Sequence, residues 1–148
     1  MAKHTITHTC GHEVVHNLTG KSSYRQWKKD QLEHEICWDC QKAARAEVAA
    51  VKTADAGLVE LGGTEKQIAW ANTIRLEKLA EIDKTVAEIK AVPASSTEKG
   101  QRNMAKLDEV VAAIRGKESA RWWIDARYDN GRRILSETVK QMKVEFER

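Results

Sequence analysis

The stretch from Leu61 to Arg75 constrains the fold more than any other part of this 148-residue sequence. Two consecutive glycines, Gly62 and Gly63, are expected to end any helix or strand that precedes them. Thr64 then stands where a helix N-cap is expected, and Gln67, three residues later, is its reciprocal partner in a capping box. Apolar residues follow at alternating steps of four and three, as in a helix that packs along one stripe. The sequence therefore predicts a long central helix over residues 65–92, which Pro93 ends.

Polar side chains interrupt this apolar stripe in its first half. Asn72 and Arg75 occupy stripe positions, and Trp70 lies beside them. Such residues either make a buried hydrogen bond or ion pair that fixes the helix register, which we favour, or form a polar site facing a partner. We expect Trp122 or Trp123 to lie against this region. The residues of the predicted structural joint are Thr64, Gln67, Trp70, Asn72, Arg75, Trp122 and Trp123.

Two further helices are expected after the central one. The apolar spacing predicts a helix over residues 97–115, and a last helix over residues 119–147. The helical phase of the last segment continues through Asn130-Gly131, so we favour one unbroken helix over the turn that Asn-Gly commonly makes. Short connections favour antiparallel neighbours. Residues 64–148 are therefore expected to form a three-helix antiparallel bundle or coiled-coil-like helices.

The N-terminal part differs from this helical domain. The alternating, β-branched residues from His4 to Thr9 and a second segment from Glu13 to Leu18 predict a β-hairpin, and a helix is plausible from about Ser23. We expect residues 1–53 to form a zinc-ribbon-like unit of hairpin plus helix, and residues 54–63 to be a linker. The predicted fold class is mainly α, with this small unit at the N-terminus.

Three cysteines suggest what holds the N-terminal unit together. Cys37 and Cys40 form a Cys-x-x-Cys pair, and the glycine after Cys10 permits a tight turn in which backbone amides point at sulfur. Histidine is the expected fourth ligand: we favour His8, with His12 as the alternative. Four such ligands predict a structural zinc ion. The competing interpretations are three idle thiols or a redox pair, for which the expected βαβ context is missing from the sequence.

Composition narrows the classes of function. The net charge of +3 is too small to predict nucleic-acid binding by itself. The sequence has no apolar run of about 18 residues, so we expect no membrane partner. The N-terminus lacks the apolar core of a signal peptide, so we expect a cytoplasmic location. We can assemble no phosphate-binding glycine loop or Ser/His/Asp constellation, so we do not expect an enzyme. A zinc hydrolase would require an open coordination position.

Two basic clusters are candidate contact surfaces. The first adjoins Tyr24 and Trp27, which are available for stacking on bases unless Trp27 turns into the core. The second lies within residues 115–133, which carry six basic and three acidic side chains, and could equally pair with glutamates of neighbouring helices. The candidate contacts to nucleic acid or to a protein partner are Lys21, Arg25, Lys28, Lys29, Arg121, Arg132 and Arg133.

Two sequence motifs are distinctive: GTEKQIAWA at residues 63–71 and SARWWIDAR at residues 119–127. Together with the cysteine motifs they resemble a group of small zinc-binding proteins encoded by bacteria, their phages and mobile elements. Members often carry Cys-x-Cys-Gly-His followed by Cys-x-x-Cys, and this chain has His8 where the first cysteine would stand. The resemblance implies zinc binding and a phage or plasmid setting, and it implies no activity.

These observations together predict a non-enzymatic binding protein with a structural zinc ion. Its expected partner is a protein, such as a host protein that a phage or mobile-element accessory protein binds or inhibits. Nucleic-acid binding is the alternative, and a zinc hydrolase is the least favoured. The helices also offer an interface for a homodimer.

Overall fold

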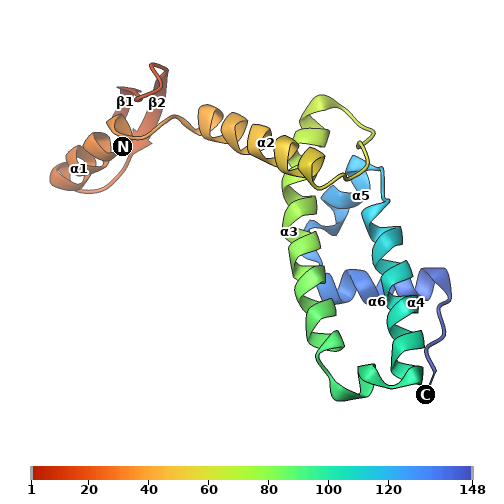
Figure 1. The fold of residues 1–148 in the computed structure, drawn as a ribbon. Coiled ribbons are helices and arrows are strands. Elements are labelled where there is room, and N and C mark those ends of the chain that lie inside the picture. Colours follow the sequence, from red (N-terminus) through yellow and green to blue (C-terminus); the bar gives the residue numbers. More distant parts are fainter. Residues whose placement is uncertain (1, 148) are drawn as a thin grey trace. The chain divides into compact units, whose positions relative to one another are not determined.

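The computed structural model describes residues 2–147 of the chain (Figure 1). The chain divides into two compact units, Met1–Arg45 and Ala46–Arg148, and the boundary falls inside helix α2 (Trp38–Asp55). The predicted fold class is confirmed, because the described residues are mainly helical and contain a single antiparallel hairpin near the N-terminus. No described helix has the length and apolar character needed to cross a membrane.

The first unit consists of a hairpin and a helix. Strands β1 (Ala2–Thr7) and β2 (Glu13–Leu18) pair antiparallel, with His4 opposite His16, as the alternating pattern predicts. Helix α1 (Ser22–Glu33) packs against β1, yet none of its own residues is buried. The buried residues of this unit are Ile6, His8, Leu18 and Cys37. A core of this size cannot by itself stabilise a fold of about 45 residues, so an additional cross-link is needed.

The central helix of the second unit, α3 (Glu65–Lys90), begins as predicted. The hydroxyl of Thr64 accepts a hydrogen bond from the backbone amide of Gln67 at 3.3 Å, and the Gln67 side chain accepts one from the Thr64 amide at 3.0 Å. This reciprocal pair satisfies two amides that a helix start would otherwise leave without partners. The short 3-10 helix η1 (Pro93–Ser96) and helix α4 (Glu98–Arg115) follow.

The prediction of one unbroken last helix is wrong. The segment divides into α5 (Ala120–Asp125), the 3-10 turn η2 (Ala126–Tyr128) and α6 (Gly131–Met142). The backbone is extended at Asp129, and the side chain of Asn130 caps α6 by accepting a hydrogen bond from the amide of Arg133. The Asn-Gly pair therefore starts a new helix.

Because of this break, the second unit is not a three-helix antiparallel bundle. Helix α6 contacts both α3 and α4, and Figure 1 shows it running across them rather than alongside. A β-carbon added at Gly131 would lie 2.8 Å from the backbone carbonyl carbon of Glu81. Only glycine permits so close an approach of α6 to α3, and this tertiary contact overrides the helical phase of the sequence.

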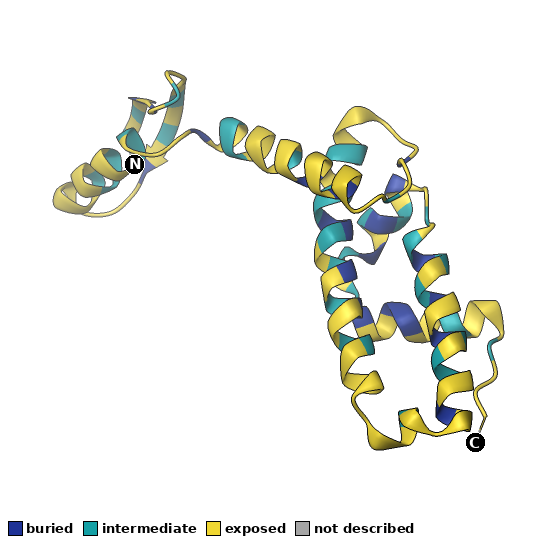
Figure 2. Ribbon diagram, in the orientation of Figure 1, coloured by how far each residue is buried: buried dark blue, intermediate teal, exposed yellow. Residues whose placement is uncertain are grey.

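The core of the second unit draws on α3, α4, α5, α6 and the connector that precedes α3 (Figure 2). Leu61, which we assigned to a linker, is buried in this core. The amide of Gly62 donates to the carbonyl of Glu118 at 2.7 Å, and the Ala120 amide donates to the carbonyl of Gly62 at 3.1 Å. The end of the predicted linker is therefore an integral part of the fold. The buried core residues are Leu61, Ala71, Leu79, Ile82, Leu107, Val110, Ile114, Ala120, Trp123, Ala126, Ile134 and Leu135.

Candidate metal centre

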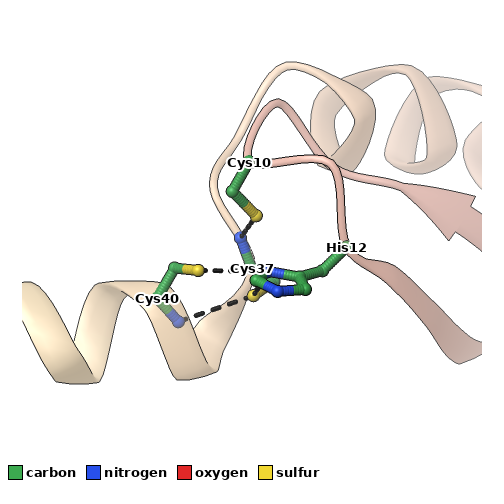
Figure 3. Close-up of side chains that lie close together, drawn as sticks. All are labelled: Cys10, His12, Cys37 and Cys40. Carbon is green, nitrogen blue, oxygen red and sulfur yellow. Dashed lines mark hydrogen bonds between the residues drawn. The ribbon is translucent and has the colours of Figure 1, made fainter.

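Four side chains of the first unit converge on one point. Cys10 and His12 come from the turn between β1 and β2, and Cys37 and Cys40 come from the start of α2 (Figure 3). One potential ligand atom from each lies within 4.8 Å of the other three. The set of three thiols and one imidazole is one of the ligand combinations that zinc prefers in structural sites.

The distances suit a tetrahedral ion. Nδ1 of His12 lies 3.2 Å from Sγ of Cys40 and 3.7 Å from Sγ of Cys37. In a regular tetrahedron with zinc–sulfur bonds of about 2.3 Å and zinc–nitrogen bonds of about 2.0 Å, sulfur and nitrogen are about 3.5 Å apart. The two measured distances bracket this value, so a zinc ion fits among these atoms without a large rearrangement of the chain.

The glycine after Cys10 has the role expected for it. Gly11 has a φ of +80°, in the left-handed region that favours glycine. Its amide donates to the carbonyl of His8 at 2.8 Å, and the His8 amide donates to the carbonyl of His12 at 3.0 Å. This closed turn brings His12 back toward the sulfur of Cys10.

Backbone amides point at two of the sulfurs. The Cys37 amide lies 3.3 Å from Sγ of Cys10, and the Cys40 amide lies 3.5 Å from Sγ of Cys37. Such hydrogen bonds favour the thiolate, which is the form that binds a metal. The Cys37 amide, followed by the backbone of His12, lowers the pKa of the Cys10 thiol to about 6.

Without a cation, a second thiol of this cluster is harder to deprotonate than the first. A hydrogen bond with the Cys37 thiol, together with burial and the nearby Cys10 sulfur, raises the pKa of the Cys40 thiol to about 11. Neighbouring sulfurs of like charge disfavour each other's ionisation. A divalent cation removes this conflict, because a coordinating thiol loses its proton outright.

The preference for His8 as the fourth ligand is corrected by the structure, which places His12 with the cysteines. Nδ1 of the buried His8 ring donates to the carbonyl of Glu35 at 3.1 Å, and its Nε2 lies 3.0 Å from Nε2 of His16. His8 directly follows β1 and, like Ile6, is buried.

The aromatic residues of the basic cluster on α1 are open to solvent, whereas Arg25, Lys28 and Lys29 are half-buried. Tyr24 and Trp27 are each 53% exposed, and their ring centroids are 5.6 Å apart, so Trp27 does not turn into the core. Arg25 donates to the carbonyl of Gly20, and Lys29 lies 3.5 Å from a carboxylate oxygen of Glu33. Lys21 and Lys28, the other members of this cluster, also lie on or beside α1.

The three residues of the last segment that were predicted as contacts are paired with carboxylates. Exposed ion pairs join Arg121 to Asp125 at 3.7 Å, Arg132 to Glu88 at 3.7 Å and Arg133 to Asp129 at 3.2 Å. These pairs match the interpretation in which the basic side chains neutralise acidic neighbours.

The residues of the predicted structural joint between the two units lie only partly as expected. Trp123 is fully buried, and its indole N–H donates to the carbonyl of Lys117 at 3.1 Å. Trp122 meets Trp123 edge to face. The exposed ring of Trp70 has the guanidinium of Arg127 at 5.6 Å from its centroid, a neighbour that the sequence did not indicate.

Comparisons with protein-family models, with curated proteins and with solved structures found no match. The interpretation therefore depends on the chain's own residues. The four converging ligands are its firmest basis, because their types, spacing and geometry agree on a metal-binding site.

Proposed function

We propose that the protein is a non-enzymatic binding protein whose N-terminal unit is held by a structural zinc ion. The convergence of Cys10, His12, Cys37 and Cys40 carries this proposal. Four protein ligands complete the tetrahedral shell of zinc and leave no position for the activated water of a hydrolase. This closed set supports a structural ion over the catalytic alternative.

The small core of the first unit explains why it needs a metal. A two-stranded hairpin is marginally stable in water, and α1 contributes no buried residue of its own. A zinc ion would tie the hairpin turn to the start of α2, two segments about 27 residues apart in the sequence. Metal binding and folding of this unit should therefore be coupled.

Metal removal tests this proposal. We expect one zinc ion per chain by elemental analysis, and a cobalt-substituted protein with the intense d–d bands of tetrahedral thiolate coordination. A chelator should collapse the NMR dispersion of residues 2–45 and leave that of residues 46–147 in place. A spectrum that the chelator leaves unchanged, or a cobalt spectrum of five- or six-coordination, would reject the structural role.

The α1 surface is the best-supported contact surface of this unit. Tyr24 and Trp27 lie exposed beside four basic side chains, and no acidic residue occurs between Gly20 and Lys29. Exposed aromatic rings among cations match the requirements of single-stranded nucleic acid, whose bases stack and whose phosphates attract cations. We therefore propose nucleic acid as the partner of this surface. The basic residues are Lys21, Arg25, Lys28 and Lys29.

Salt dependence tests the α1 proposal directly. Fluorescence anisotropy of a labelled single-stranded oligonucleotide should show binding that weakens steeply with salt. Replacing Lys28 and Lys29 by Gln should reduce the log–log salt slope by about 0.7 for each phosphate that the variant no longer neutralises. The matched control, Lys42→Gln on α2, should leave the slope unchanged. A lack of binding at about 50 mM salt would reject the proposal, because electrostatic contacts are strong there.

A protein partner is the second candidate, and a different observation favours it. In the second unit, exposed Trp70 and Tyr128 flank Arg127, whose guanidinium carbon lies 4.1 Å from the Tyr128 ring centroid. Aromatic residues and arginine are enriched at the energetic centres of protein interfaces. With the resemblance to phage and mobile-element proteins, this surface suggests a host protein as partner.

A pull-down from host lysate tests the second candidate. A stoichiometric partner should be recovered with the natural chain and lost with Arg127→Ala. The matched control Arg121→Ala removes another exposed arginine from the same segment and should keep the partner. Recovery that is equal for both variants would exclude this surface as the interface.

A further inference from the structure

Residues 143–147 follow α6 and run along α4 without regular secondary structure, and we call them the strap (Figure 1). Two hydrogen bonds close the turn that starts the strap. The Lys143 amide donates to the carbonyl of Lys140 at 3.2 Å, and the Val144 amide donates to the carbonyl of Val139 at 3.1 Å. Lys143 has a φ of 53°, as in the left-handed helix ending that these two bonds define. The turn directs the strap from the end of α6 onto the surface of α4.

Two side chains of α4 hold the main chain of the strap. Nδ2 of Asn103 donates to the carbonyl of Glu147 at 3.0 Å, and Oδ1 of Asn103 accepts from the amide of Glu147 at 2.8 Å. Nζ of Lys106, about one turn further along α4, donates to the carbonyl of Glu145 at 2.7 Å. The bonded groups belong to alternate residues, as expected of an extended chain. Because these bonds go to the main chain, an extended segment of different sequence can make them too.

The same face of α4 also binds a carboxylate. Nε and Nη2 of Arg102 each donate to one carboxylate oxygen of Glu147, both at 2.9 Å, in the bidentate arrangement that suits an arginine and a carboxylate. The hydrogen bonds from Arg102 lower the pKa of Glu147 against the opposing effect of burial, and the charges of Arg102, Lys106 and Lys99 add to the lowering. We define the basic α4 face as Lys99, Arg102, Asn103 and Lys106.

The strap is weakly attached to the rest of the second unit. Val144 is the only residue of the strap that packs against the core, and it is only partly buried. The side chains of Arg102 and Glu147 are 56% and 38% exposed, and an ion pair so open to solvent contributes little to stability. Lys143 adopts a left-handed conformation that is unfavourable for a residue with a β-carbon. A weakly packed segment of this kind opens locally, so a competing segment can replace it without unfolding the helices.

The chemistry of the basic α4 face favours a peptide over nucleic acid as its occupant. The amide of Asn103 pairs with both an N–H and a C=O group of one residue, and a phosphate group offers no such donor. The cations of the face attract an acidic segment and repel a basic one. The face therefore specifies an extended main chain together with an acidic side chain.

We propose that the basic α4 face binds an extended acidic segment of a partner protein, and that the strap occupies this face as an internal ligand. The strap is the template for the partner segment: an apolar residue is followed three residues later by a glutamate, as Val144 is followed by Glu147. The site shares no residue with the zinc centre, the α1 surface or the surface around Arg127. Its success or failure is therefore separate from theirs.

A peptide that copies the strap tests the proposal on the full, zinc-loaded chain. The probe is N-acetyl-Lys-Val-Glu-Phe-Glu-amide, and the control peptide has Gln in place of the last Glu. The variant Glu147→Lys is compared with the natural chain, because Arg102 would repel the new lysine and so free the basic α4 face. In a ¹H–¹⁵N NMR titration, the probe should shift the side-chain amide signals of Asn103 in this variant.

Two affinity ratios follow from the proposal. The probe should bind the Glu147→Lys chain at least about tenfold more tightly than the natural chain, in which the strap competes at a high effective concentration. It should bind that variant about tenfold more tightly than the control peptide does, as expected for charge-assisted hydrogen bonds. Equal affinities in either comparison, or no shift at Asn103, would overturn the proposal.

Two further substitutions in the Glu147→Lys chain locate the binding site. Asn103→Ala should abolish binding of the probe, because it removes the paired contacts to one residue of the main chain. The matched control Gln101→Ala removes another amide from an exposed position on α4 and should leave the affinity unchanged. Heteronuclear NOE values at residues 144–147 should fall in Glu147→Lys, as the strap is released. A strap that stays rigid in this variant, or equal probe binding with Asn103→Ala and Gln101→Ala, would contradict an internal ligand on this face.

Discussion

The backbone amide of Gly131 donates a 2.8 Å hydrogen bond to Oε2 of Glu81 and so joins the first residue of α6 to the middle of α3. The amide at a helix start has no partner within its own helix. Here a carboxylate from another helix supplies that partner, at a position where the negative charge also suits the helix dipole. This contact accounts for the break in the segment that we predicted to be one helix.

Gly131→Ala should destabilise the protein by about 1–3 kcal/mol, the usual cost of forcing extra atoms into a packed contact. The added carbon would meet the backbone of Glu81 and Ile82, which cannot rotate away as a side chain could. Urea unfolding measures the change. Gly116→Ala is the matched control, because its β-carbon would meet no atom closer than 3.4 Å. Equal effects of the two substitutions would contradict this account of Gly131.

The Glu81 contact should also make stability depend on pH. The hydrogen bond from Lys78 and the Gly131 amide lower the pKa of Glu81, against the opposing effect of burial. A carboxyl whose pKa is lower in the folded state stabilises it above the unfolded pKa, which is about 4.3 for Glu. This contribution is lost as the pH falls through the folded value. In Glu81→Gln, the free energy of unfolding should therefore fall less as the pH is lowered into the acidic range. Glu77→Gln should show the same fall as the natural chain.

Local signals in the sequence identify helix starts and metal ligands well. Thr64 and Gln67 cap α3 as expected, because a capping box involves only residues three apart. Cys10, Cys37 and Cys40 were equally recognisable from their types and spacing. These features depend on short stretches of chain, so no tertiary information is needed to find them.

Contacts between distant segments could not be predicted in this way. Whether α6 starts at Gly131 depends on Glu81, fifty residues earlier in the chain. The partner of Arg75 is a backbone carbonyl, for which side-chain identity gives no signal. The choice between His8 and His12 depends on the direction in which the turn at Gly11 aims each ring.

His12→Ala should lower zinc affinity by more than about 100-fold. Losing even a residue that hydrogen-bonds to a zinc ligand typically lowers metal affinity by about 10–100-fold, and losing a ligand should cost more. His8→Gln should keep most of the affinity, because the His8 ring bonds to Glu35 and lies against His16. Competition with a zinc chelator of known affinity measures both variants. The opposite order of effects would restore His8 as the fourth ligand.

Trp27→Ala should weaken binding of a single-stranded oligonucleotide by about tenfold, because one stacked base is worth about 1–3 kcal/mol. The melting temperature should hardly change, since Trp27 is 53% exposed and is not part of the buried core of its unit. Trp38→Ala removes another exposed tryptophan from the same unit and is the control. A comparable loss of affinity in both variants, with full zinc content, would show that the α1 surface is not the binding site.

The most direct test of the central claim is the zinc content of Cys37→Ala, measured with its unfolding curve. Cys37 is the buried member of the four ligands, and its amide and sulfur also bond the other cysteines. The account predicts one zinc ion in the natural chain and none in the variant. It also predicts lost NMR dispersion for residues 2–45 and an unchanged spectrum for residues 46–147. A variant that keeps its zinc and the melting curve of the natural chain would contradict the proposed metal centre.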